Sequence, residues 1–107
     1  MAGRGRVLAP PGGPGGLTVT DRPEQLRYEI EVEGEVAGFL LYRVEPGVLD
    51  LVHTDVDPKW EGKGVGAALV RGALDDVRAR GLKARPSCPF VAAYIRRHAE
   101  YEDLVTP

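Results

Sequence analysis

Apolar residues occupy every second position over Leu26–Glu33, and charged residues stand between them. This alternation predicts a strand with one buried and one solvated face. A denser apolar run over Val36–Val44 predicts a more central strand, and Val48–Val56 predicts a third, with short glycine-containing turns between them. Three strands joined in this way form an antiparallel meander. A shorter run, Leu17–Thr20, predicts an additional edge strand before the meander.

The hydrophobic period changes to that of a helix after Pro58. Apolar residues recur at four-residue spacing from Gly64 to Arg80, which predicts an amphipathic helix that packs on the sheet and ends at Gly81. A short strand over Leu82–Pro86 and a second helix over Pro89–His98 follow. A crossover of this length places the short strand parallel to the third strand. The expected fold class is α+β, a meander followed by helix, strand and helix.

Two oppositely charged pairs in the long helix are spaced four residues apart. They are Arg71 with Asp75, and Asp76 with Arg80. Because residues at this spacing are neighbours on a helix surface, we expect both pairs on its solvent-exposed side.

The first sixteen residues differ in composition from the rest of the chain. They hold six of the 14 glycines and three of the nine prolines, and such a segment buries too little apolar surface to offset the entropy of ordering. We therefore expect a disordered Gly/Pro-rich tail over residues 1–16. Residues 17–107 have the length of one small domain.

Composition argues against several functional classes. One cysteine excludes an internal disulfide, and two histidines without any Cys-x-x-Cys or His-x-x-x-His pair argue against a metal site. No apolar run approaches the roughly 18 residues of a membrane-spanning helix, so a cytoplasmic protein is expected. The chain carries a net charge of −2, and without Arg4 and Arg6 it has 12 basic against 16 acidic residues. This balance argues against nucleic acid as a partner.

Three glycines at alternate positions, Gly62, Gly64 and Gly66, lie between the third strand and the long helix. They leave backbone N–H groups unshielded where the helix dipole is positive, an arrangement that holds a phosphate or diphosphate, and Lys63 adds a positive charge. A tight turn without a ligand explains the same glycines about equally well. A Walker-type loop is excluded because no Gly-Lys-Ser/Thr follows, and a dinucleotide-binding fold needs a larger parallel sheet.

The segment Glu61–Ala67 resembles the Gln/Arg-x-x-Gly-x-Gly/Ala motif with which GNAT acetyltransferases bind the diphosphate of acetyl-coenzyme A. Glu61 stands where that family usually has Gln or Arg. The blocks Asp50–Val56 and Pro86–Val91 resemble the small, truncated GNAT subgroup of N-acetyltransferase domain-containing proteins. The resemblance covers roughly residues 18–105, and it implies a GNAT-like fold with acetyl-coenzyme A (acetyl-CoA) as cofactor.

The resemblance further implies a V-shaped split between the third strand and the strand before Cys88, with the pantetheine arm between them. The predicted cofactor-binding residues come from the third strand and from the segment Glu61–Ala67, which we call the glycine loop. They are Val52, His53, Thr54, Asp55, Val56, Glu61, Gly62, Lys63, Gly64, Val65, Gly66 and Ala67. A tyrosine that protonates the leaving thiolate in many GNAT enzymes aligns here with Ile95, one residue from Tyr94.

Cys88 is the predicted catalytic residue. It is the only thiol, it lies between two prolines, and a following helix N-terminus favours a thiolate. An acyl-cysteine intermediate and direct attack by the amine, the usual GNAT route, both remain open, and so does an inert buried cysteine. Strand alternation would place His53 on the same face as Leu51, so we expect His53 to line the cofactor first and to act as a base second. A packed histidine is the alternative.

These features together predict an acetyl-CoA-dependent N-acetyltransferase that acts on a primary amine of a small molecule or a protein lysine. Only Gly34 and Glu35 stand where larger relatives carry helices, so the acceptor site is expected to be open. We expect a monomer or weak homodimer. The alternative is a CoA-binding module without catalysis, a sensor or partner subunit, which Glu61 and the displaced Tyr94 favour.

Overall fold

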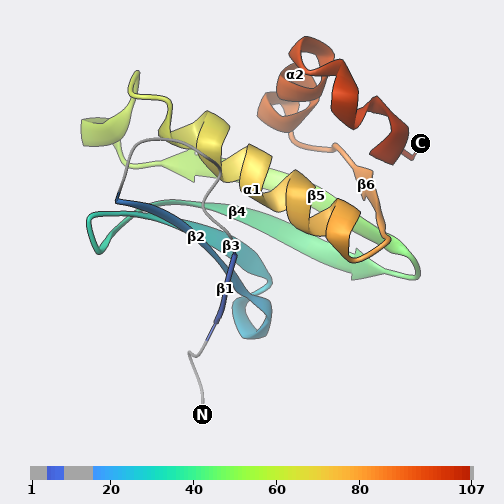
Figure 1. Cartoon of the computed structure of the whole chain (residues 1–107), viewed down its shortest axis with the longest axis horizontal. Helices are drawn as coiled ribbons and strands as arrows, with labels where there is room; N and C mark the ends of the chain where they lie inside the picture. Colours follow the sequence, from blue (N-terminus) through green and yellow to red (C-terminus); the bar gives the residue numbers. More distant parts are fainter. Residues whose placement is uncertain (1–4, 9–15, 107) are drawn as a thin grey trace.

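The computed structural model describes residues 5–8 and 16–106. Within these residues six strands form one sheet in chain order (Figure 1). The strands are β1 (Arg6–Val7), β2 (Leu17–Arg22), β3 (Arg27–Val32), β4 (Glu35–Glu45), β5 (Val48–Val56) and β6 (Lys83–Arg85). The helices are α1 (Val65–Ala79) and α2 (Pro89–Arg97), with 3-10 turns η1 (Pro23–Gln25), η2 (Pro58–Trp60) and η3 (Ala99–Leu104).

The predicted α+β class and its meander are confirmed. β1 to β5 pair antiparallel and β6 pairs parallel with β5, as the crossover rule requires. The long helix follows its predicted bounds, with Gly64 as N-cap, and Gly81 follows its C-cap residue in the left-handed region at φ 70°. Leu26, predicted within a strand, instead ends η1 with φ 54°. β2 exists but is not the edge of the sheet, because β1 flanks it.

Part of the predicted tail belongs to the sheet. Arg6–Val7 pairs with β2, and Arg6 lies opposite Asp21. The expectation of disorder is therefore wrong for these two residues. Arg6 forms ion pairs with the buried Asp21 and Asp76, and composition alone does not reveal these partners. Residues 1–4 and 9–15 lie outside the described residues, and disorder there stays a prediction.

α1 buries its apolar side against one face of the sheet. The fully buried side chains of this interface come from α1 and from four strands: Leu69, Val70, Ala73, Leu74, Val77, Val19, Tyr28, Ile30, Leu40, Leu49 and Leu51. Each large apolar side chain contributes about 1.5–3 kcal/mol on burial. Helix and sheet approach closely at Gly72, where an added Cβ would lie 2.9 Å from Cγ2 of Val19.

An ionic cluster lies within this interface, and we define it as Arg6, Asp21, Tyr28, Tyr42 and Asp76. The Arg6 guanidinium donates to both Asp76 oxygens at 2.9 and 2.8 Å and to Asp21 at 3.0 Å. The Tyr28 hydroxyl donates to Asp76 at 2.7 Å, and the Tyr42 hydroxyl donates to Asp21 at 2.6 Å. Both carboxylate side chains are 3% exposed. The expectation that Asp76 lies on the exposed side of the helix is therefore wrong.

The C-terminal elements pack on α1. Asp75, predicted to pair with Arg71, instead accepts a hydrogen bond from the Tyr101 hydroxyl at 2.6 Å. The last described residue, Thr106, donates its N–H to Ala84 of β6 at 2.9 Å, beside a bridge between Ala84 and Val105. These contacts fasten η3 to the β6 edge of the sheet.

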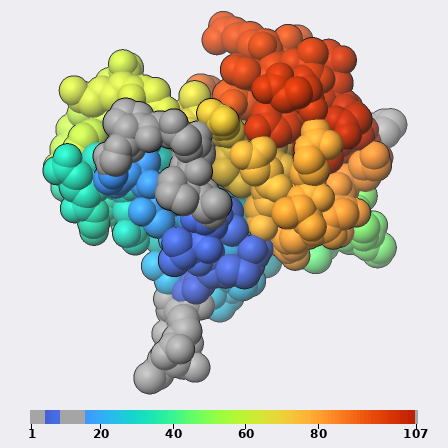
Figure 2. All heavy atoms as spheres, in the orientation of Figure 1, coloured from blue at the N-terminus to red at the C-terminus, as the bar shows by residue number. Residues whose placement is uncertain are grey.

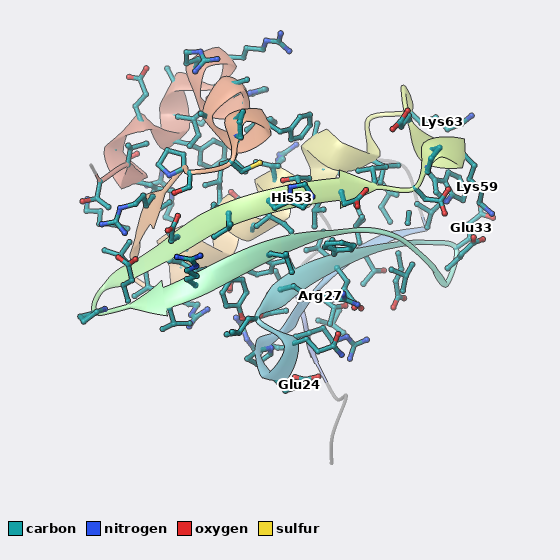
Figure 3. The ribbon with its side chains drawn as sticks, turned by 180° about the vertical axis from the view of Figure 1, so that it is seen from behind. Glu24, Arg27, Glu33, His53, Lys59 and Lys63 are labelled. Atoms are coloured by element: carbon teal, nitrogen blue, oxygen red, sulfur yellow. The ribbon has the colours of Figure 1, made fainter. Side chains whose placement is uncertain are left out.

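The other face of the sheet carries no helix of the described residues, as the view from behind shows (Figure 3). Arg27 and His53 are labelled on that face. We call it the open face. No helix in the described part of the chain is long and apolar enough to cross a membrane.

Candidate functional site

β5 and β6 separate after three residue pairs. Their register ends at Asp50 opposite Arg85, and the Cys88 N–H then donates to the Leu51 carbonyl at 2.8 Å. Pro86 has no N–H with which to continue the ladder. Beyond this point, the structure gives β5 no strand partner on the β6 side within the described residues. The divergence agrees with the split expected from the family resemblance.

A β-bulge in β5 changes which side chains face α1. His53 lies opposite Leu41, whereas Leu51 lies opposite Tyr42, so Val52 is the extra residue. One extra residue shifts the period-two alternation by one position. Leu51 and Thr54 consequently lie on the α1 side, whereas His53 is exposed on the open face. The expectation that His53 shares a face with Leu51 is wrong for this reason.

The glycine loop turns the chain from β5 into α1. Gly62 and Gly64 both adopt φ 78°, in the left-handed region, and Gly64 is the N-cap of α1 without any side-chain cap. The first N–H groups of a helix have no intrahelical acceptor. At Gly66 an added Cβ would lie 3.0 Å from Cζ of Phe90. The loop therefore needs its glycines for two distinct reasons, backbone conformation at Gly62 and Gly64 and space at Gly66.

Two adjoining cavities open beside this loop. The strand cavity has a volume of about 450 Å³ and is lined by Thr54, Val56, Trp60, Glu61, Gly62, Gly64, Val65, Gly66, Ala67, Phe90 and Arg97. The helix cavity, about 780 Å³, is lined by Leu17, Val32, Trp60, Lys63, Gly64, Val65, Ala67, Ala68, Arg71, Phe90, Ala93, Tyr94, Arg97 and His98. Figure 2 shows the surface hollowed between the glycine-loop segment and α2.

Most of the predicted cofactor-binding residues meet at the strand cavity. They are Thr54, Val56, Glu61, Gly62, Gly64, Val65, Gly66 and Ala67. Lys63 lines the helix cavity instead. Val52, His53 and Asp55 line neither cavity, because the bulge turns His53 and Asp55 away from α1.

Cys88 lies next to the strand cavity. It is 3% exposed, it is the N-cap residue of α2, and its Sγ lies 3.4 Å from the Oγ1 of Thr54, which lines the cavity. Its carbonyl accepts the Ala92 N–H at 3.0 Å. Ser87 is held to Asp50 by a 2.6 Å hydrogen bond between its Oγ and a carboxylate oxygen. The backbone of Cys88 is thus held by hydrogen bonds to both β5 and α2.

Aromatic side chains form the wall shared by the two cavities. Trp60 lines both, and its Nε1 is buried without a hydrogen-bond partner among the described residues. Phe90, which the sequence reading did not select, also lines both although it is 47% exposed. An apolar ring directly after Pro89 was the available signal. Tyr94 stacks on His98 at 3.9 Å between ring centroids, and Ile95 is buried.

Arg97 is the second lining residue that the sequence reading did not assign to the site. The structure places it at both cavities. Within the described residues, no group of three or more His, Cys, Asp or Glu side chains is arranged to hold a metal ion.

Comparison with known proteins gives a consistent result. A family model described as GCN5-related N-acetyl-transferase matches residues 27–104. Protein NATD1 of Mus musculus is 29% identical over 89 residues, which cover 81% of this chain and 79% of that protein. Protein NATD1 of Homo sapiens is 35% identical over 60 residues, 55% of this chain and 53% of that protein. A mycothiol acetyltransferase of Clavibacter michiganensis is 37% identical over 87 residues, 76% of this chain but 28% of that protein.

Proposed function

This chain belongs to the GCN5-related N-acetyltransferase family, and from that membership we propose that it transfers the acetyl group of acetyl-CoA to a primary amine. The observation that carries the proposal is the cavity at the start of α1. Helix N–H groups without intrahelical acceptors face this cavity beside β5, and the Cys88 thiol lies 3.4 Å from Thr54, which lines it.

The residues at the strand cavity fit acetyl-CoA. The positive helix end and the unshielded N–H groups of Val65, Gly66 and Ala67 suit a diphosphate. The free edge of β5 beyond Leu51 suits an amide-containing arm that pairs with strand backbone. When bound, acetyl-CoA would supply an acetyl thioester. Transfer to a neutral amine forms a C–N bond and breaks the C–S bond, and the proton lost by the amine nitrogen converts the leaving thiolate to the free thiol.

The proposed role of Cys88 follows from its place next to the strand cavity, behind the lining residue Thr54. Its backbone is held by β5 and α2, and Thr54 lies within hydrogen-bond range of the thiol. The geometry suits a group that contacts the reacting end of the donor. Direct attack by the amine and a covalent acetyl-Cys88 step both remain compatible with this position.

The acceptor is proposed to approach from the open face. His53 is exposed there, on the strand that also carries Thr54 on its opposite side. An imidazole is a side chain that can remove a proton from an ammonium substrate, so we propose His53 as the base. Since no helix of the described residues covers this face, a large acceptor such as a protein lysine is accommodated as readily as a small amine.

The alternative function is a CoA-binding module without catalysis. Glu61 favours it, because an acid lines the cavity that would hold a polyanion. The cytoplasmic location and the monomer or weak homodimer predicted from the sequence stay predictions.

Two measurements on the full chain test the proposal. Calorimetric titration with CoA is expected to show saturable binding, and acetyl-CoA with a panel of amines is expected to release free thiol. Binding without thiol release would favour the non-catalytic module, and absence of binding would reject both functions.

Substitution of Cys88 tests the chemical route. Cys88→Ala is expected to lower turnover with little change in CoA affinity. Intact-protein mass spectrometry of the wild-type chain after incubation with acetyl-CoA alone distinguishes the routes, because an acetyl adduct that Cys88→Ala lacks requires a covalent step. Full activity of Cys88→Ala would remove the catalytic role altogether.

A further inference from the structure

The charged residues of the strand cavity suit the anionic acetyl-CoA only if Arg97 contributes to its binding. Glu61 and Arg97 are its only charged lining residues within the described part of the chain. Glu61 occupies the motif position at which the resembling family usually carries Gln or Arg. A carboxylate there repels a phosphate, so the cavity needs a positive group from another element.

Arg97 lies where the two cavities meet. It belongs to the last turn of α2 and lines both the strand cavity and the helix cavity. Its side chain is exposed, and the structure gives it no hydrogen bond or ion pair within the described residues. The five N–H donors of its guanidinium are therefore free for a ligand.

Several other arginines of this chain form ion pairs with acids, as Arg78 and Arg6 illustrate. Arg78 donates to both oxygens of Asp103 at 2.9 Å each, and Arg6 does the same to Asp76 at 2.9 and 2.8 Å. Each of these side chains has a protein partner of opposite charge. Arg97 has no such partner within the described residues and lies at the junction of the two cavities instead.

A structural explanation of Arg97 accounts for only part of this placement. Cations stabilise the C-terminal end of a helix through its dipole, and both Arg96 and Arg97 lie in the last turn of α2. Arg96 is also exposed but lines neither cavity. The helix dipole therefore explains why cations lie here, but it does not explain why one of them faces the cavities.

The helix cavity extends the same positive surroundings. Its lining includes Lys63, Arg71 and Arg97 and contains no Asp or Glu. The whole chain carries a net charge of −2. A basic hollow in an acidic protein attracts an anionic ligand to one place.

We propose that Arg97 binds the diphosphate of the acyl donor at the junction of the strand and helix cavities, where it supplies the positive charge that Glu61 does not. This inference rests on the proposed function, since it names a binding residue for the same donor. A guanidinium fork matches phosphate oxygens in pairs, so Arg97 and the helix N–H groups would hold the diphosphate from two sides.

The test compares two adjacent arginines by calorimetric titration of the full chain with CoA. Arg97→Ala is expected to weaken CoA binding about tenfold or more, the range for loss of charged hydrogen bonds. Arg96→Ala, the matched control on the same helix, is expected to change it less than twofold. Equal weakening by both variants would reduce the effect to general electrostatics and overturn the assignment.

Ligand fragments separate the diphosphate from the rest of the donor. Dephospho-CoA keeps the diphosphate and lacks the 3′-phosphate, so Arg97→Ala is expected to weaken its binding by the same factor as for CoA. A loss confined to CoA would assign Arg97 to the 3′-phosphate instead and overturn the proposal. The unliganded melting temperature of each variant is expected to equal that of the wild type, and a lowered value for Arg97→Ala would indicate a structural role instead.

A substitution of Glu61 tests whether the positive charge of Arg97 compensates for the negative charge of Glu61. Glu61→Gln removes the negative charge from the strand cavity and is expected to tighten CoA binding severalfold. No gain would remove the premise that Arg97 offsets Glu61. If wild-type chain does not bind CoA at all, the proposed function fails; if it binds and Arg97→Ala binds equally well, only the role of Arg97 fails.

Discussion

Polar groups near the two ends of α1 differ in whether they have hydrogen-bond partners within the protein. Near the C-terminal end of α1, Asp76 is buried and accepts four hydrogen bonds, two from Arg6, one from Tyr28 and one from Arg80, the partner expected from the sequence. At its N-terminal end, within the described residues, the helix N–H groups lack a side-chain cap, the Trp60 Nε1 is buried without a partner, and the nearby Arg97 has no hydrogen bond or ion pair. The same helix therefore has one end whose polar groups are paired within the protein and one end at which we propose that the ligand binds.

This difference separates stability from binding. Buried polar groups that find partners contribute to a unique, stable packing, whereas buried groups without partners carry a cost that a ligand can remove. Substitutions at the two ends of α1 are therefore expected to affect different measurements, and the predictions below follow from that separation.

The largest effect is expected in the ionic cluster. Asp76→Ala leaves the Arg6 guanidinium and the Tyr28 hydroxyl without their shared acceptor. We expect a loss of about 3 kcal/mol in the free energy of unfolding, toward the lower end for a broken buried pair because Arg6 is half exposed. Urea denaturation measures it.

The neighbouring residue supplies the control for that loss. Asp75 is exposed and accepts one hydrogen bond from the Tyr101 hydroxyl, so Asp75→Ala is expected to cost about 1 kcal/mol. CoA affinity is expected to stay unchanged in Asp76→Ala. A large change in affinity would show that the two ends of α1 are coupled.

Two glycines of α1 allow the same substitution beside the core and beside the strand cavity. An added Cβ at Gly72 would lie 2.9 Å from Val19 in the core, and one at Gly66 would lie 3.0 Å from Phe90 at the strand cavity. Gly72→Ala is expected to lower the free energy of unfolding by about 1–3 kcal/mol through overpacking, with CoA affinity intact. Gly66→Ala is expected to weaken CoA binding about tenfold with a smaller stability loss. The reverse pattern would contradict the separation.

Acid pH is expected to weaken the paired end. Burial alone would raise the pKa of Asp76, but the hydrogen bonds from Arg6 and Tyr28 outweigh it and hold that pKa below its ordinary value of 3.8. The stabilisation by Asp76 is therefore complete above pH 3.8 and is lost as the pH falls below it. Asp76→Asn should show a shallower loss of melting temperature in this range; an identical acid profile would exclude Asp76 as a source.

The smallest effect is expected at the turn that presents Cys88. Ser87→Ala removes the 2.6 Å hydrogen bond to Asp50 and is expected to cost about 1 kcal/mol of stability. Turnover with acetyl-CoA should fall by a few fold, while CoA affinity changes less. The matched variant Thr106→Ala keeps its backbone hydrogen bond to Ala84 and should change neither measurement. A larger fall in affinity than in turnover would place Ser87 in the binding site itself.

The sequence predicted the elements well because their signals are local. The alternation around Tyr28 and Ile30 and the four-residue spacing of α1 each depend on a single element, and both match the structure. The bulge at Val52 left no such signal, because it depends on how β4 and β5 align. The side of His53 was consequently mispredicted although its strand was correct.

Interactions between residues far apart in the sequence were the second limit on what could be predicted from it. Arg6 and Asp76 are 70 positions apart, and composition placed Arg6 in a disordered tail. Asp76 lies four positions from Arg80, which suggested a surface pair. A buried carboxylate gives no signal in a sequence until its distant partners are known. Arg97 was underestimated in the same way, since only the packing of α2 beside the glycine loop brings it to the cavities.

Trp60 has an optical consequence. It is the only tryptophan of the chain and stands in the wall shared by both cavities. Light emitted by indole after selective excitation therefore comes from a single ring at the candidate site. Its emission wavelength depends on how much water surrounds the ring and on whether Nε1 has an acceptor. The fluorescence of Trp60 can therefore report ligand binding at the candidate site without an added label.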